Sequence, residues 1–218
     1  QTCALPIWNM RAIWEIEVMH IDRMAVLAAL CLTLSSTGWS ADSLTGQEAY
    51  NSGDYQTALT EWQPLAEEGF ADAQFGMGLL YANGFGVSID DDLALNWYQL
   101  AADQGHAEAQ CSLAVMYSNG WGVTQSDEEA FKWYRLAAEA GLTQAQTSLA
   151  KMYAKGRGTG KDVVEAHRWY SIASGLGDSG AAFKRDSLAA KMSPVELSES
   201  DRLTSIWIDS HQNLLAHQ

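Results

Sequence analysis

The sequence predicts an all-α protein, a right-handed superhelical solenoid of antiparallel helix pairs with a C-terminal capping helix. Three observations predict it: similar residues return every 36 positions, apolar residues follow helical spacing within each unit, and glycines separate the helices. The period is carried by three sets of residues: Ala58, Ala94, Ala130 and Ala166; Gly69, Gly105, Gly141 and Gly177; and Ala73, Ala109, Ala145 and Ala181. A fixed period of this size is typical of stacked supersecondary units that bury their apolar faces against their neighbours.

Each unit is expected to hold two helices. In the second unit, the apolar residues between positions 94 and 102 follow the i, i+3, i+4, i+7, i+8 spacing of an amphipathic helix. Gly105 follows this helix where the chain needs a positive φ, so a side chain there is expected to cost about 1 kcal/mol. A second apolar stripe covers residues 109–117 and stops at Asn119-Gly120. The small alanines allow the helices to approach closely, while larger side chains fill the space between them.

The second unit reads A-x-x-W-Y-x-x-A-A-x-x-G-x-x-x-A-Q-x-x-L-A-x-x-Y-x-x-G-x-G-V, and this pattern resembles the Sel-one-like repeat family, relatives of the tetratricopeptide repeats. The resemblance runs from Asp54 to Met192 and divides the chain into units 54–89, 90–125, 126–161 and 162–192. The first unit departs from the pattern, because Glu61-Trp62 replaces Trp-Tyr and Pro64 is expected to kink or shorten its first helix. The fourth unit lacks the last tyrosine and the G-x-G, so we expect it to end the array.

The first residues are expected to be foreign to the mature protein. Residues 1–7, QTCALPI, match the translation of CAG ACG TGT GCT CTT CCG ATC, part of a common sequencing-library adapter. We therefore interpret residues 1–18 as a non-native or untranslated leader. A genuine N-terminus that happens to match the adapter is the alternative.

Residues 19–40 have the outline of a secretory signal peptide. A weakly basic start precedes an uncharged apolar run at 24–34, and small residues follow it, which places cleavage after Ser40. An uncleaved anchor is the alternative, but this run is short for a bilayer core of about 30 Å. The expected location is therefore periplasmic or secreted, in a bacterium, with no stable membrane insertion after cleavage.

Capping residues mark the helix starts. Residues 41–53 are expected to form an N-terminal capping helix, and Asp54 then caps the first repeat helix. The acidic runs 90–92 and 127–129 stand at the next two starts, where each carboxylate favours the helix dipole by about 0.3–1 kcal/mol. A calcium site at 90–92 is the alternative. It is disfavoured because these residues lead straight into a helix instead of wrapping an ion.

Residues 193–218 are expected to form a C-terminal capping helix and a tail. Ser193 and Pro194 fit the N-cap and first helical positions, and Glu196 completes a capping box. Apolar residues continue to Trp207, so the helix should end near His211 and close the open end of the stack.

Charge is distributed unevenly. Residues 41–131 hold fifteen Asp or Glu and no Lys or Arg, while residues 132–218 hold eleven basic and nine acidic residues. The expected mature net charge of −13 thus combines −15 with +2. Such a field argues against nucleic acid and anionic membrane surfaces as partners. It favours either a cationic partner at the N-terminal repeats or a role in solubility alone.

The candidate binding strip lies on the first helix of each unit, on the concave face by analogy with tetratricopeptide grooves. Positions two and five residues after the repeated alanine supply it: Asn96, Gln99, Lys132, Arg135 and Arg168. The three basic residues are candidates for contacts with anionic groups. Trp97, Trp133 and Trp169 are either anchors with exposed edges or core residues, and their spacing favours the core.

Catalytic motifs are absent from the sequence. His106, His167 and His211 fall in different parts of the array, and no H-E-x-x-H, G-x-S-x-G or C-x-x-C occurs. Cys111 is the one cysteine of the expected mature chain, at a helical position where a small, partly buried residue is expected. No cofactor or metal is expected.

We interpret the chain as a non-catalytic protein-protein interaction scaffold of the bacterial cell envelope, expected to be a monomer that binds a protein or peptide. The resemblance implies a role in envelope signalling, surface assembly or host contact. A weak cell-wall hydrolase is one alternative. A cysteine-rich branch of the family has been linked to β-lactam hydrolysis, but its paired cysteines are missing here. A structural spacer is the other alternative.

Overall fold

The structure, a computed structural model, describes residues 44–212, which form ten α-helices and no strands. The helices are α2 (Leu44–Ser52), α3 (Tyr55–Glu67), α4 (Ala71–Asn83), α5 (Asp91–Asp103), α6 (Ala107–Asn119), α7 (Asp127–Glu139), α8 (Thr143–Lys155), α9 (Val163–Gly175), α10 (Ser179–Ala189) and α11 (Pro194–Ser210). The predicted all-α class is confirmed. The expected leader and signal peptide lie outside the described residues.

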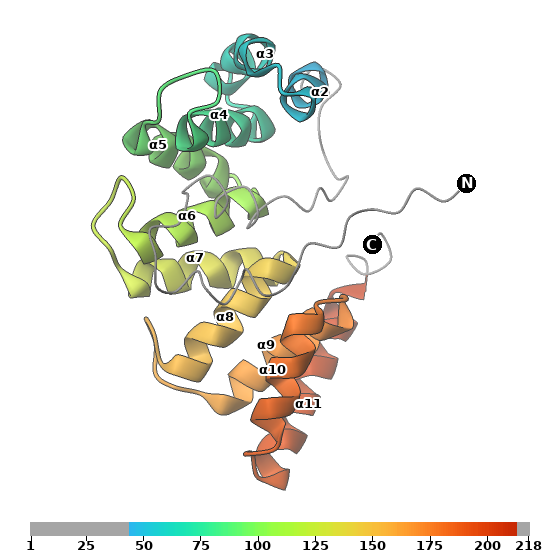
Figure 1. Ribbon diagram of the computed structural model, residues 1–218. Coiled ribbons are helices and arrows are strands. Elements are labelled where there is room, and N and C mark those ends of the chain that lie inside the picture. Colours follow the sequence, from blue (N-terminus) through green and yellow to red (C-terminus); the bar gives the residue numbers. More distant parts are fainter. Residues whose placement is uncertain (1–43, 213–218) are drawn as a thin grey trace.

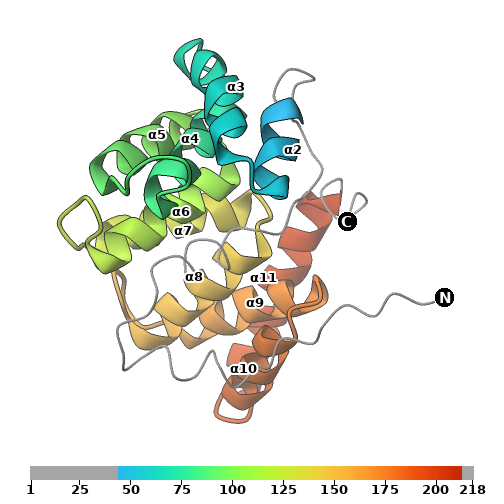
Figure 2. The same cartoon turned by 45° about the horizontal axis from the view of Figure 1, so that its top comes forward.

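The helices alternate between two roles. We call α3, α5, α7 and α9 the A helices and α4, α6, α8 and α10 the B helices. Each helix from α2 to α10 packs mainly against the helices before and after it in the sequence. Figures 1 and 2 show the result, a curved stack that runs from α2 to α10. The core is therefore a row of interfaces between sequence neighbours, as expected for a repeat array.

One aromatic position of the A helices fills these interfaces. It lies four residues after the repeated alanine and is occupied by Trp62, Tyr98, Tyr134 and Tyr170, all of which are buried. Trp62 is larger than tyrosine, and the following B helix makes room for it. A Cβ on Gly76 would lie 2.6 Å from the Trp62 ring, whereas the next two units carry Ser112 and Ser148 at that position. The first unit thus departs from the sequence pattern at both Trp62 and Gly76, and the missing side chain of Gly76 accommodates the larger ring of Trp62.

Pro64 does not shorten its helix. It lies in the last turn of α3, which spans 13 residues, as α5 and α7 do. A proline removes one backbone donor and so one intrahelical bond, here to the carbonyl of Thr60. Because Pro64 is exposed and close to the helix end, this loss does not interrupt a buried ladder.

Two glycines show why the turns need this residue. Gly105 has a φ of 90°, in the left-handed region, as predicted for the residue that follows the A helix. Gly122, the second glycine of the N-G-W-G loop, has a φ of 63°. A Cβ there would lie 2.5 Å from the backbone oxygen of Asp91 at the start of α5. The loop after a B helix therefore packs against the start of the A helix of its own unit.

Buried glutamines join the two helices of a unit. Gln74, Gln110 and Gln146 on the B helices each donate from Nε2 to a carbonyl in the last turn of the preceding A helix, at 3.1–3.2 Å. The same three carbonyls also accept from the backbone N–H of the glycine that follows each A helix, at 2.9–3.1 Å. Each glutamine amide is therefore a second donor to its carbonyl, and it ties the B helix to the end of the A helix. This explains the Ala-Gln pair of the repeat pattern.

Several of the acidic residues at the helix starts act as caps, but the cap of α7 is Ser126 and not a member of the acidic run 127–129. Asp54 accepts from the backbone N–H of Thr57 at 3.2 Å, and Asp90 accepts from that of Leu93 at 2.9 Å. Asp127 lies in the first turn of α7 and binds the Arg157 guanidinium through two bonds, at 2.6 and 3.0 Å. Among residues 44–212, no three His, Cys, Asp or Glu side chains gather in a way that would hold a metal ion.

The last B helix, α10, has a polar outer face. Phe75 on α4 is buried against Tyr98 and His106 of the next unit, but its equivalent on α10, Phe183, is 73% exposed. Neighbouring positions that hold buried residues on α4 carry Lys184, Asp186 and Ser187 on α10, all exposed. Polar outer faces on terminal units are typical of repeat arrays. Thus α10 ends the stack.

Helix α11 is present where it was predicted, but it packs on α9 and does not extend the stack beyond α10. Figures 1 and 2 both show it beside α9. Its start has the predicted capping box: Glu196 N–H donates to Ser193 Oγ at 3.3 Å, and Ser193 N–H donates to Glu196 Oε2 at 2.7 Å. The terminal helix therefore covers an A helix instead of closing the open end.

Candidate partner-binding surface on the A helices

The five predicted binding residues lie on three successive A helices, because the 36-residue period places them at equivalent positions. Asn96 and Gln99 lie on α5, Lys132 and Arg135 on α7, and Arg168 on α9. Asn96, Lys132 and Arg135 are exposed, whereas Gln99 and Arg168 are half-buried. They share the side of the A helices that faces away from the buried alanines. We call this side the A-helix face.

Most of these residues already have partners on their own helix. Lys132 Nζ lies 2.5 Å from Glu129 Oε1, and Arg168 Nη1 lies 3.0 Å from Glu165 Oε2. An exposed i,i+3 pair such as that of Lys132 and Glu129 contributes little to stability. Both pairs reduce the net positive charge of the strip. Within the part of the chain that the structure describes, Arg135 is the basic member of the set without an ion pair. The basic strip is thus weaker than its sequence indicates.

The three tryptophans differ in exposure. Trp169 is buried, with 1% of its surface exposed, while Trp97 and Trp133 are half-buried and pack against the core. The interpretation as core residues holds fully for Trp169. The other two also form part of the A-helix face.

Sequence reasoning missed an apolar position on this face. Leu100 on α5 and Leu136 on α7 lie six residues after the repeated alanine and are 48% and 46% exposed. Ile172 occupies the same position on α9 but is 2% exposed. The signal was available, because all three residues share the 36-residue register with the predicted strip. Leu93, at the start of α5, is a further exposed residue of the same face, at 39%.

Helix α11 accounts for the burial of Ile172. Trp207 of α11 lies 6.0 Å from Trp169, ring centre to ring centre, and the two rings meet edge to face. The Trp207 indole N–H donates to Glu139 Oε2, at the end of α7, at 2.9 Å. Nearer the start of α11, Ser200 Oγ lies 2.8 Å from His167 Nδ1, and both side chains are buried. Thus α11 covers the A-helix face of α9 and leaves that of α5 and α7 open.

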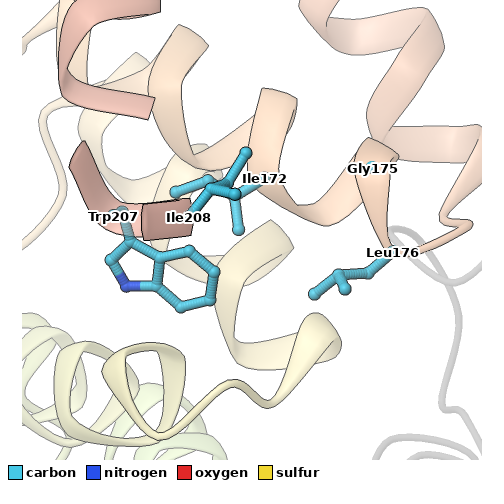
Figure 3. Close-up of a pocket in the computed structure, with 5 residues that line it drawn as sticks. All are labelled: Ile172, Gly175, Leu176, Trp207 and Ile208. Atoms are coloured by element: carbon cyan, nitrogen blue, oxygen red, sulfur yellow. The ribbon is translucent and has the colours of Figure 1, made fainter. Parts of the chain in front are cut away.

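The hollow between α9 and α11 is small and apolar. Ile172, Gly175, Leu176, Trp207 and Ile208 line it, and its volume is about 80 Å³. Figure 3 shows the Trp207 ring beside Ile172, with Leu176 on the far side of the hollow. Sites for small molecules usually measure about 300–1,000 Å³ and carry convergent polar groups. This hollow therefore looks like an imperfection of packing and not a substrate site.

The titratable groups with shifted pKa values are dispersed. Burial lowers the pKa of His167 below its usual value, and burial raises the pKa of Tyr50 and of Tyr170 to about 12. The Arg157 hydrogen bonds hold the pKa of Asp127 below its usual value. Each shift has a packing or pairing cause at a different place in the stack. Within residues 44–212, these groups form no acid and base pair around a common cavity.

Other candidate groups have structural roles. His106 is the N-cap of α6, where its Nδ1 accepts from Ala109 N–H at 3.3 Å, and its ring stacks on Phe75. Cys111 is fully buried within α6. None of the helices between residues 44 and 212 is long and apolar enough to cross a membrane.

Comparison with known proteins agrees with this architecture. The Sel1 repeat model matches residues 71–106, 107–142 and 143–178. Each matched unit begins at a B helix and ends after the next A helix, so it shares the 36-residue period of the predicted units in a different phase. No curated protein matches the chain.

Solved structures give the same picture. A Sel1 repeat protein from Oxalobacter formigenes is 36% identical with a TM-score of 0.64, over 66% of this chain and 59% of that one. The protein c5321, described as a protective antigen of uropathogenic Escherichia coli strains with an SLR fold, is 24% identical with a TM-score of 0.64. That match covers 86% of this chain and 37% of the other, and it supports the fold alone. The chain belongs to the Sel1 repeat family, whose members generally serve as protein-interaction scaffolds and not as catalysts.

Proposed function

We propose that this protein is a non-catalytic scaffold that binds a protein or peptide partner through the A-helix face, the concave side of the solenoid. One observation carries the proposal. The face holds half-exposed leucines on α5 and α7, Leu100 and Leu136, whereas the equivalent residue on α9 is covered by α11. A surface that the molecule itself covers at one end is suited to contact with another chain.

The polar residues of the face would orient the partner. Asn96 and Arg135 are exposed and offer donors, while Lys132 and Arg168 offer charges that Glu129 and Glu165 already share. Gln99 donates to Asp103 at 2.8 Å and would extend the polar rim on α5. Arg168 stands at the edge that α11 reaches, so we place it at the end of the binding surface. A polar rim around apolar anchors is typical of protein interfaces.

We further propose that the protein works in the cell envelope of a bacterium as a monomer. The proposal rests on the apolar run at 24–34 and the small residues that follow it. Mass spectrometry of the N-terminal peptide from a periplasmic fraction tests it. A mature chain that begins at Ala41 is the expected result, and a chain that retains residues 24–34 would contradict export by cleavage.

Pull-down from an envelope extract tests the binding face. The double variant Lys132→Glu, Arg135→Glu should change the amount of partner captured, because it reverses both exposed charges of the face on α7. The matched control is Lys161→Glu, Lys191→Glu, which makes the same charge change at exposed residues outside the A helices. Equal capture by both variants would show that the A-helix face does not bind the partner. That result would favour the spacer alternative, in which these residues can be changed freely.

A further inference from the structure

An apolar strip runs over the uncovered part of the A-helix face. On α5, Leu93, Trp97 and Leu100 follow i, i+4, i+7 spacing, and the two leucines are 39% and 48% exposed. On α7, Trp133 and Leu136 repeat the last two positions, with Leu136 at 46% exposure. We call these five residues the apolar strip. Spacing of this kind on a helix surface is that of a face made for another helix.

The molecule contains its own example of what covers this strip. The equivalent positions on α9 are Trp169 and Ile172, and α11 buries both to 1% and 2% exposure. The covering element is an amphipathic helix that brings an aromatic ring, Trp207, against them. The strip on α5 and α7 continues this interface at the same register, so its geometry suits a second helix beside α11.

Acidic groups border the strip. Glu139, at the end of α7, accepts the Trp207 N–H. Its equivalent on α5 is Asp103 and on α3 is Glu67, and both are exposed carboxylates at the last turn of an A helix. The helix dipole places partial negative charge at the same ends. A ligand that approaches α5 therefore meets acceptors and negative charge beside the leucines.

The charged side chains of the N-terminal repeats also produce a negative electrostatic field around the strip. Residues 44–131 contain no Lys or Arg, so α3, α5 and the start of α7 contribute no positive side chain around the strip. Lys132 and Arg135 lie beside the α7 part of the strip, but Lys132 is paired with Glu129, so the negative charge is concentrated around the α5 part. A helix with Lys or Arg flanking its apolar side would be attracted, and an acidic helix would be repelled. We propose that the apolar strip docks a cationic amphipathic helix of a partner protein across α5 and α7, beside α11. This inference rests on the proposed scaffold function and specifies the kind of partner.

A defined probe tests the proposal on the full chain. The probe is a fluorescent 18-residue peptide of Leu and Lys at amphipathic helical spacing, measured by anisotropy at about 0.15 M salt. Two peptides serve as controls: one with the same composition in scrambled order, and one with Glu in place of Lys. The amphipathic Lys peptide should bind at least tenfold more tightly than either control. Equal binding of the Glu peptide would overturn the charge argument.

Matched variants locate the site. Leu100→Ser, Leu136→Ser should weaken binding of the Lys peptide at least tenfold. Phe183→Ser, Val195→Ser should leave it within twofold, because these two residues are 73% and 78% exposed elsewhere on the molecule. Circular dichroism checks that each variant keeps its helix content. As a second measurement, the indole N–H resonances of Trp97 and Trp133 should shift on titration. Unchanged binding in Leu100→Ser, Leu136→Ser would overturn the proposal.

Two outcomes separate this inference from the proposed function. If the natural partner is lost with Lys132→Glu, Arg135→Glu but kept with Leu100→Ser, Leu136→Ser, the scaffold function stands and the apolar strip is refuted as the docking site. If sedimentation shows that the full chain forms dimers that Leu100→Ser, Leu136→Ser dissolves, the occupant is a second copy, and the cationic partner helix is refuted.

Discussion

Replacement of Trp207 by alanine should detach α11 from the repeat array. Trp207 is 2% exposed, meets Trp169 edge to face, and stacks on His211 at 4.2 Å. Truncation of a buried tryptophan to alanine typically costs about 3–5 kcal/mol. The lost bond to Glu139 adds little to this, because that carboxylate is exposed and regains water. We therefore expect a loss of about 4 kcal/mol, large for a helix held mainly by one A helix.

Thermal and urea unfolding measure this loss. In a protein of this size, 1 kcal/mol corresponds to roughly 2–4 °C in Tm, so Trp207→Ala should lower Tm by roughly 8–16 °C. The control Trp207→Phe keeps most of the apolar contact and loses the N–H donor, so it should cost about 1 kcal/mol.

Hydrogen exchange shows which helices lose stability in Trp207→Ala. Units of a repeat array contact their neighbours alone, so amides of α9 and α11 should exchange faster in Trp207→Ala while those of α3 to α5 keep their rates. A loss below about 1 kcal/mol, or faster exchange spread evenly over the array, would refute the view that Trp207 holds α11 on α9.

Three further predictions concern stability. Gly122→Ala should cost about 2 kcal/mol or more in urea unfolding, because φ is positive and a Cβ would meet the Asp91 backbone, whereas Gly160→Ala, which has open space, should be near neutral. Asp90→Ala should cost about 1 kcal/mol through the lost cap, with no effect on helix content beyond α5. Burial lowers the pKa of His167 in the folded state, so the unfolded state binds more protons, and stability should fall as pH drops below about 6.5. His167→Leu combined with Ser200→Ala should flatten this pH dependence.

The sequence was sufficient to predict the repeats because their physics is local. The alanines at helix contacts, the glycines with positive φ and the capping carboxylates each act within one unit or between adjacent units, and the 36-residue period repeats the same evidence several times. Trp62 illustrates the limit. Its place in the core follows from register, but the room it needs comes from Gly76 on another helix, which only the packing reveals.

The position of α11 could not be predicted in the same way. Residues 193–212 lie outside the period, so register gives them no partner, and their capping box fixes only where the helix starts. Their contacts with α9 depend on Trp207 and on the buried pair of Ser200 and His167. His167 occupies the position that Leu95 and Phe131 hold in earlier units. This polar residue at an otherwise apolar position indicates that α9 packs against a different kind of neighbour there.

The candidate site was predicted in part. The period placed Asn96, Gln99, Lys132, Arg135 and Arg168 on one face, and whether that face binds a partner stays a prediction. The ion pairs that weaken its charge were readable from the sequence, since Glu129 and Glu165 precede their partners by three residues on the same helix. The shared register of Leu100 and Leu136 was also readable from the sequence, but their exposure was not, because it depends on how far α11 reaches.

The polar outer face of α10 has an evolutionary consequence. A new unit added after α10 would have to pack on Lys184, Asp186 and Ser187, and burial of these side chains without partners is costly. A copy of residues 90–125 inserted between α8 and α9 would instead meet an apolar neighbour on each side, while α2 and the pair of α10 and α11 kept their places. Lineages of this protein should therefore change length by duplication or loss of interior units, with both ends inherited unchanged.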